Sequence, residues 1–146
     1  MNDQIAVEFA QDLRKAITLL IKKLRKESPS GQGLSLTERS TLALLQQHKS
    51  LLPGELAAME MITNQSMSQV LNHLLELGYI TRTVSQADKR KINITLSVLG
   101  EETIAKYGHE RDEWLARAIS EACSPEEQAL FKQIIAPINK LVDFKL

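Results

Sequence analysis

Apolar side chains recur at helical spacing near the start of the chain. The pattern covers residues 5–24, and its apolar positions are Phe9, Leu13, Ile17, Leu20 and Leu24. Basic residues crowd the last turns of this segment, where they complement the helix macrodipole. The sequence SPSGQG at 28–33 then interrupts the pattern with one proline and two glycines. The pattern therefore predicts one long first helix that ends before residue 28.

Two shorter helical patterns follow this break. We expect the second helix to begin near Thr37, with that threonine as its N-cap. We expect the third to begin around Pro53, because proline suits the first position of a helix. The apolar residues assigned to these two helices are Leu42, Leu44, Leu45, Leu56, Ala57 and Met59.

The segment 64–78 has the clearest amphipathic pattern. Its apolar residues recur at i, i+3, i+4 and i+7 and form one continuous face: Met67, Val70, Leu71 and Leu74. Gly78 is a typical C-terminal stop. We predict a helix that packs on one face and leaves the other exposed.

The periodicity changes from helical to alternating after Gly78. Residues 79–84 place Ile80 and Val84 on one face together with Arg82, and residues 92–97 alternate isoleucine or leucine with Asn, Thr and Ser. These patterns predict two strands of a hairpin. The connection between them contains three basic residues, Lys89, Arg90 and Lys91, which we expect at the hairpin tip.

The remainder of the chain is predicted to form two helices. The first covers 98–122, and the residues expected to face inward are Ile104, Tyr107, Leu115, Ala118, Ile119 and Ala122. Ser124 and Glu127, with Pro125 between them, form a capping-box pattern for the second. The apolar residues of this last helix are Phe131, Ile134, Ile135, Ile138, Leu141 and Val142.

The order of these elements predicts a fold that is mainly α with a small β-hairpin wing. We interpret residues 1–146 as a single domain, in which 34–100 form a winged helix-turn-helix core. The segments 1–27 and 101–146 are interpreted as flanking N- and C-terminal dimerisation helices. Their apolar stripes are wide enough to need a partner, and a single chain of 146 residues offers few other places to bury them.

Composition indicates a soluble, cytoplasmic protein. Apolar residues make up 43% of the chain and charged residues 25%, which is ordinary for globular proteins. No signal peptide or membrane span is expected, and the single cysteine, Cys123, excludes an intramolecular disulfide. The formal net charge is zero, but residues 61–97 contain four basic and two acidic groups, whereas 98–146 contain six basic and nine acidic groups. The middle of the chain is therefore its basic part.

The polar face of 64–78 has an unusual composition for a solvated helix. It displays uncharged hydrogen-bonding groups, with Glu76 as the only acid and no lysine or arginine: Gln65, Ser66, Ser68, Gln69, Asn72 and His73. Asn and Gln can bond bidentately to adenine, and Ser can contact bases or phosphates in the major groove. We interpret the segment as a recognition helix. The alternative is a polar surface with no partner.

The basic cluster at the hairpin tip fits the same interpretation. A two-stranded ribbon can carry cations beside the groove that a recognition helix enters, where they contact phosphates or insert arginine into the minor groove. Asp88 is predicted to brace Arg90 or to cap the amides of the loop. The alternative is a solvated turn. The DNA-contact residues predicted outside the helix are Arg82, Lys89, Arg90 and Lys91.

Residues 36–100 resemble the winged helix-turn-helix core of the MarR family of bacterial transcription regulators. The residues with this resemblance are Leu36-Thr37, Glu55-Leu56-Ala57, Met67-Ser68-Gln69-Val70, Leu74, Gly78-Tyr79-Ile80, Arg82, Asp88-Lys89-Arg90, Thr95-Leu96-Ser97 and Gly100. The Asp-x-Arg wing, followed by Leu-Ser and then glycine, is the specific part.

The resemblance implies a homodimer whose first and last helices intertwine on a pseudo-palindromic operator. By position, it implies that Arg90 enters the minor groove with Asp88 as its orienting partner. It implies that Ser66, Ser68, Gln69, Asn72 and His73 lie in or beside the major groove. The family often senses small aromatic ligands, so an effector of unknown identity is expected, although the six aromatic residues give that pocket little specific support.

Other chemistry finds little support in the sequence. We expect no cofactor and no metal, because the three histidines are isolated from other ligands. Some members of the family sense peroxide through a cysteine in the first helix; Cys123 is instead expected at the end of the fifth helix, so oxidant sensing by that route is not expected. No nucleophile–base pair or phosphate-binding glycine loop indicates an enzyme. Two hypotheses remain: a dimeric DNA-binding repressor, and a dimeric winged-helix module that binds a protein. They differ in salt dependence, because phosphate contacts release counterions.

Overall fold

The computed structural model describes residues 2–146; Met1, the first residue of the predicted segment 1–27, lies outside the described residues. The fold is mainly α with one small antiparallel sheet, as the sequence predicts. In chain order the elements are α1 (Asp3–Lys26), a 3-10 turn η1 (Pro29–Gly31), α2 (Leu36–His48), β1 (Ser50–Leu51), α3 (Pro53–Met59), α4 (Asn64–Glu76), β2 (Ile80–Val84), β3 (Ile92–Leu96), α5 (Val98–Ala122) and α6 (Pro125–Asp143).

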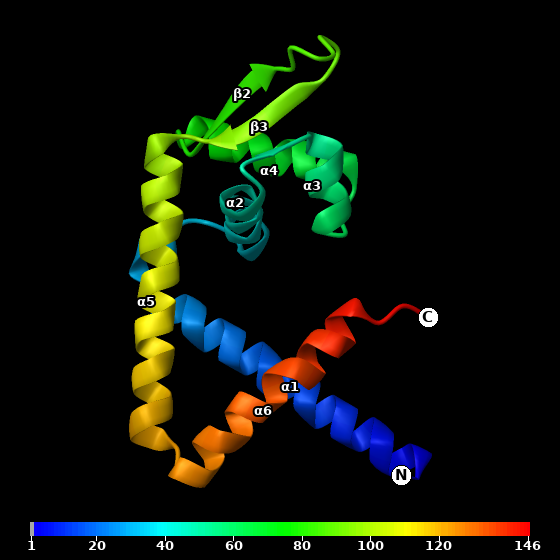
Figure 1. Cartoon of the computed structure of the whole chain (residues 1–146), viewed down its shortest axis with the longest axis vertical. Helices are drawn as coiled ribbons and strands as arrows, with labels where there is room; N and C mark the ends of the chain where they lie inside the picture. Colours follow the sequence, from blue (N-terminus) through cyan, green and yellow to red (C-terminus); the bar gives the residue numbers. More distant parts are fainter. Residues whose placement is uncertain (1) are drawn as a thin grey trace.

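Figure 1 shows a lobe at one end of the molecule, formed by α2, α3, α4 and the β2–β3 hairpin. Helix α5 starts at the hairpin and runs away from the lobe, and α1 and α6 lie at the opposite end, where they cross in this view. The sheet has the order β1-β3-β2. The two-residue strand β1 was not predicted, because two residues are too short to show an alternating pattern.

The hydrophobic core lies inside the lobe. Its most deeply buried side chains come from α2, α3, α4 and β3, and they are Leu42, Leu45, Leu56, Met67, Leu71, Leu74 and Ile94. The predicted apolar face of α4 is thus confirmed, with Val70 half-buried beside it. Leu56 and Ala57 of α3 are buried as predicted, whereas Met59, the last residue of α3, is 42% exposed.

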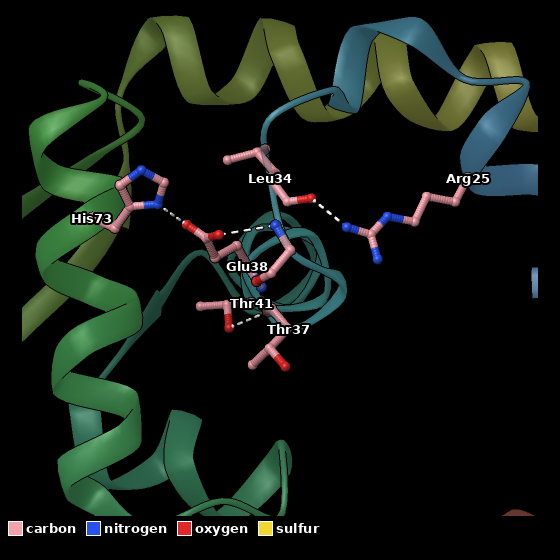
Figure 2. A network of polar contacts seen from close by, with 7 residues as sticks. Arg25, Leu34, Thr37, Glu38, Thr41 and His73 are labelled. Atoms are coloured by element: carbon pink, nitrogen blue, oxygen red, sulfur yellow. Dashed lines mark hydrogen bonds and ion pairs between the residues drawn. The ribbon is translucent and has the colours of Figure 1, made fainter. Parts of the chain in front are cut away.

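The prediction that Thr37 caps the second helix is wrong. Ser35 is the N-cap: its hydroxyl accepts from the backbone of Glu38 at 3.1 Å, and the Glu38 carboxylate accepts from the backbone of Ser35 at 2.9 Å. Thr37 lies within the first turn, where its carbonyl accepts from the Thr41 hydroxyl (Figure 2). The reciprocal capping box favours Ser35 because it satisfies two backbone donors instead of one.

The boundaries of the later helices largely follow the predictions. Ser124 and Glu127 form the predicted capping box at the start of α6. Gly78 has a φ of 78°, the left-handed conformation that ends α4. On α5, Ile104 and Tyr107 are buried as expected, but Ala122 is exposed. Ala122 is the last residue of α5, and the chain turns away there into α6.

Helices α1 and α6 have no buried residue within the chain. Both expose large apolar side chains along their length; Phe9 of α1 and Ile135 of α6 are each 59% exposed. Apolar area of this extent is uncommon on the surface of a monomeric protein. The two helices therefore present an apolar surface that the chain itself does not cover.

Candidate nucleic-acid interface

Helix α4 presents its polar face to solvent and anchors its apolar face in the core. Its N-cap, Thr63, accepts a hydrogen bond from the Ser66 backbone at 3.0 Å and lies 2.9 Å from the Ser66 hydroxyl. Four of the predicted DNA-contact residues on this face are exposed: Gln65, Ser68, Gln69 and Asn72. Ser66 is also exposed, although its hydroxyl takes part in the cap. The burial of Met67, Leu71 and Leu74 fixes which side of the helix faces outward.

His73, the sixth predicted contact on α4, is directed toward α2. Its Nδ1 pairs with the carboxylate of Glu38, as Figure 2 shows, while 45% of the side chain remains exposed. Glu38 itself is buried. Burial raises the pKa of this carboxyl, but the hydrogen bonds from Ser35 and from His73 lower the pKa by more, so it lies below its ordinary value. His73 therefore fastens the outward-facing helix to α2.

Substitution of Glu38 tests this attachment. Glu38→Gln is expected to lower the free energy of unfolding by about 1–3 kcal/mol at pH 7, because a buried charge-assisted hydrogen bond is lost. Since the pKa of Glu38 is lower in the folded state, its contribution is present above the unfolded pKa and is lost as the pH falls through the folded pKa. The difference in the free energy of unfolding between wild type and Glu38→Gln should therefore become smaller below about pH 4.3. Urea unfolding between pH 7 and pH 3 measures this difference.

Glu127→Gln provides the matched control. Glu127 occupies the same capping-box position on α6 and also bonds Ser124, but it is exposed and contacts no histidine in the described chain. Glu127→Gln should therefore lower the free energy of unfolding by less than Glu38→Gln does. Equal losses from the two substitutions would mean that the contact with His73 contributes nothing to stability.

Arg82 extends from β2 to the polar face of α4. Its guanidinium donates a hydrogen bond from Nη2 to Oδ1 of Asn72 at 2.8 Å. The turn between the two elements is tightly held: the Ser97 hydroxyl donates to the Gly78 carbonyl at 2.5 Å, and the Ser97 backbone donates to Tyr79 at 3.0 Å. Gly100 closes the turn, since an added Cβ there would lie 1.9 Å from the Tyr79 oxygen. The hairpin and α4 are thus held at a fixed spacing.

The loop between β2 and β3 contains a braced arginine. The Asp88 carboxylate accepts three hydrogen bonds from Arg90: from the backbone amide at 3.1 Å and from Nε and Nη2 at 3.2 and 3.3 Å. The hydrogen bond from the Arg90 side chain, and after it the one from its backbone, holds the pKa of Asp88 below its ordinary value. The Arg90 side chain is nevertheless 90% exposed. Lys89 and Lys91 are exposed beside it.

Sequence reasoning missed two features that support this surface. Strand β1 pairs with β3 through Ser50–Thr95 and Leu51–Ile94, so that β3 is the central strand and the hairpin is joined to the lobe. The second feature is Glu38. Its Ser-x-x-Glu capping pattern was visible in the sequence, but its partner His73 lies 35 residues away and no local signal connects the two.

Three helices followed by a hairpin whose strands meet the exposed helix define a winged helix-turn-helix protein. A model of the MarR family matches residues 32–91. An HTH-type transcriptional regulator of Mycobacterium bovis is 31% identical over 112 residues, which cover 77% of this chain and 78% of the relative. The HTH-type transcriptional repressor YetL of Bacillus subtilis is 31% identical over 80% of this chain and 71% of its own length. The chain belongs to the MarR family and is a DNA-binding transcriptional regulator.

Solved structures show the same fold. A MarR family protein from Bacillus stearothermophilus superposes with a TM-score of 0.83 at 19% identity and covers 99% of both chains. A mutant of MepR from S. aureus, solved bound to an oligodeoxyribonucleotide, superposes with a TM-score of 0.65 at 22% identity and covers 92% of this chain and 96% of its own.

Neither a membrane-spanning helix nor a metal site is found among the described residues. None of the helices within residues 2–146 has an apolar stretch long enough to span a bilayer. Over the same residues, no group of three or more His, Cys, Asp or Glu side chains is arranged to hold a metal ion.

Proposed function

We propose that this regulator acts as a homodimeric repressor on a pseudo-palindromic operator, with α4 in the major groove and the wing at the minor groove. The proposal rests chiefly on the hydrogen bond between Arg82 and Asn72, because it joins the hairpin to the polar face of α4 on one surface. On this surface α4 offers uncharged side chains suited to base edges. The hairpin adds cations suited to phosphates.

The wing assignment is supported by the geometry of Asp88 and Arg90. An arginine that is both exposed and braced by a carboxylate keeps its charge in solvent and has fewer conformations to lose on binding. Arginine is also the side chain that is attracted by the negative potential of a narrow minor groove. In this proposal Lys89 and Lys91, exposed on either side of it, contact the flanking phosphates.

The dimer is supported by the apolar surfaces of α1 and α6. A second copy of the chain would cover them and would present two α4 helices to two half-sites, about one DNA turn apart. In this proposal, 34–100 form the DNA-binding lobe, and 1–27 and 101–146 form the dimerisation helices. Repression follows if the bound dimer blocks the promoter, and the name of YetL supports this sign of regulation. A small-molecule effector stays a prediction.

Selection of bound sequences from a random DNA pool tests the proposal. The purified protein should enrich two inverted half-sites at a fixed spacing, and the affinity for them should fall steeply with salt. A winged-helix module that binds proteins would enrich no sequence. That outcome would remove the operator, the repressor role and the groove assignments together.

One substitution on α4 tests direct reading of bases. Gln69→Ala is expected to cost roughly 1–3 kcal/mol on the native operator and far less on operators altered at the base pair that Gln69 reads. Binding titrations against a panel of single-base operator variants measure this. Gln133→Ala on α6 is the control, because it removes an exposed glutamine from a helix outside the lobe. A uniform loss across the whole panel would assign Gln69 to the phosphate backbone instead.

A further inference from the structure

We infer that Arg82 sets base specificity by acting through Asn72, so that the two side chains together favour guanine over adenine at one base pair of each half-site. This inference rests on the proposed function, because it requires α4 in the major groove. It refines the expectation from the sequence, in which Asn72 and Arg82 are two separate DNA contacts and an asparagine can pair with adenine.

The contact with Arg82 fixes the orientation of the Asn72 amide. A guanidinium carries only donors, so the amide oxygen, and not the amino group, must face Arg82. The distance of 2.8 Å from Arg82 Nη2 to Asn72 Oδ1 is that of a well-formed hydrogen bond. The amino group of Asn72 is therefore the part of the amide that is turned away from Arg82.

The Arg82–Asn72 pair offers a base different hydrogen-bonding groups from those of a free asparagine. The bidentate contact of asparagine with adenine uses both ends of the amide: the oxygen accepts from N6 and the amino group donates to N7. Here Arg82 already takes one of the two acceptor sites of that oxygen, and its positive charge opposes the approach of the adenine N6 donor. The pair therefore offers a base mainly donors, which are the Asn72 amino group and the other N–H groups of Arg82. Guanine presents two acceptors in the major groove, O6 and N7, whereas adenine presents one acceptor and one donor.

Persistence of the pair on DNA depends on how firmly the two elements that carry it are held. The spacing of α4 and β2 is fixed by Gly78, by the hydrogen bonds of Ser97 and by the close approach of Gly100 to Tyr79. Arg82 stands opposite Ile94, which is fully buried, so the backbone that holds Arg82 is part of the core sheet. With the backbones held, the pair can separate only if one of the two exposed side chains rotates, as Arg82 would to reach a phosphate. If Arg82 stays on Asn72, the pair should prefer guanine. If Arg82 turns away to a phosphate, Asn72 is free to pair with adenine.

Selection from a random DNA pool distinguishes these two base preferences. Four purified full-length proteins are compared: wild type, Asn72→Ala, Arg82→Met and Lys89→Met. Asn72→Ala identifies the base pair, because its preference is lost there. The sequences selected by the wild-type protein should carry guanine at that position. Arg82→Met keeps the aliphatic stem but has no donor, so the sequences it selects should favour adenine there, with the guanine-to-adenine ratio lowered by roughly tenfold or more. Lys89→Met is the matched control: it removes one cation of the wing and should lower affinity without changing the preferred bases.

Three outcomes would overturn the inference. Wild type could carry adenine at the position marked by Asn72→Ala, or Arg82→Met could keep guanine and bind all sequences more weakly, as the loss of a phosphate contact would. If wild type enriches no sequence, the proposed function fails, and this inference fails with it. Should Arg82→Met unfold, Arg82→Leu replaces it, because leucine also has no donor, and retention of guanine by that variant would likewise contradict the inference.

Discussion

Ile135→Glu is expected to convert the protein from a dimer to a monomer at micromolar concentration and to abolish binding to the operator. Ile135 lies in the middle of α6 and is 59% exposed, so a single chain loses little packing when it is replaced. In the proposed dimer the same position is covered by the second copy. The carboxylate would then be buried without a partner.

The expected size of this effect follows from the symmetry. An unpaired charge in an interface costs about 3 kcal/mol or more, and a two-fold dimer contains the substitution twice. The dimer should be weakened by roughly 6 kcal/mol, which is about four orders of magnitude in its dissociation constant. Binding to two half-sites depends on the dimer, so operator affinity should fall with it. Sedimentation velocity and operator titration measure the two consequences.

Gln133→Glu is the control for Ile135→Glu. It adds the same charge to the same helix, but at an exposed polar position about one third of a helical turn away from the apolar stripe. It should leave both the mass and the affinity nearly unchanged. If Ile135→Glu sedimented as a dimer, α6 would have to be removed from the proposed interface.

The helices of this protein were predictable because each contains a clear local pattern of apolar residues or caps. The apolar spacing of Met67, Leu71 and Leu74 determined both the extent of α4 and the face that it buries. Glycine and the change to a period of two located the hairpin. The N-cap of α2 was misplaced because Ser35 and Thr37 are both good caps, and only the position of Glu38 three residues after Ser35 decides between them.

The candidate site was predictable as a set of exposed residues but not as a network. The composition of α4 and the Asp88–Arg90 spacing indicate which side chains face outward. The sequence does not reveal that Arg82 hydrogen-bonds to Asn72 or that Glu38 pairs with His73. The partners are 10 and 35 residues apart in the chain, and they meet only because of how the helices and strands pack. Such contacts decide which hydrogen-bonding groups remain free for a base. Counting the polar side chains of a recognition helix therefore overestimates how many of them are available to bind a base.

Arg90→Ala is expected to weaken operator binding more than a hundredfold and to flatten its dependence on salt. A hydrogen bond to a charged group contributes about 1.5 kcal/mol or more, and the dimer has two wings, so the loss is roughly 3 kcal/mol. Each phosphate charge that Arg90 neutralises contributes about 0.9 to the slope of log affinity against log salt, so the slope should fall by nearly 2. Binding titrations from 50 to 300 mM salt, roughly the range in which counterion release is measured, give both quantities.

Arg117→Ala separates a contact of the wing from a general effect of charge. Arg117 is also an exposed arginine paired with a carboxylate, here Glu121 at 2.8 Å, but it lies near the end of α5 farthest from the hairpin (Figure 1). Its removal changes the net charge by the same amount and should leave the slope nearly intact, because roughly 28 Å of helix separate it from the start of α5 at the hairpin, which exceeds the screening length. If Arg90→Ala and Arg117→Ala shifted affinity and slope equally, the braced arginine would act only through the overall field of the protein. The wing would then have no contact of its own with the minor groove.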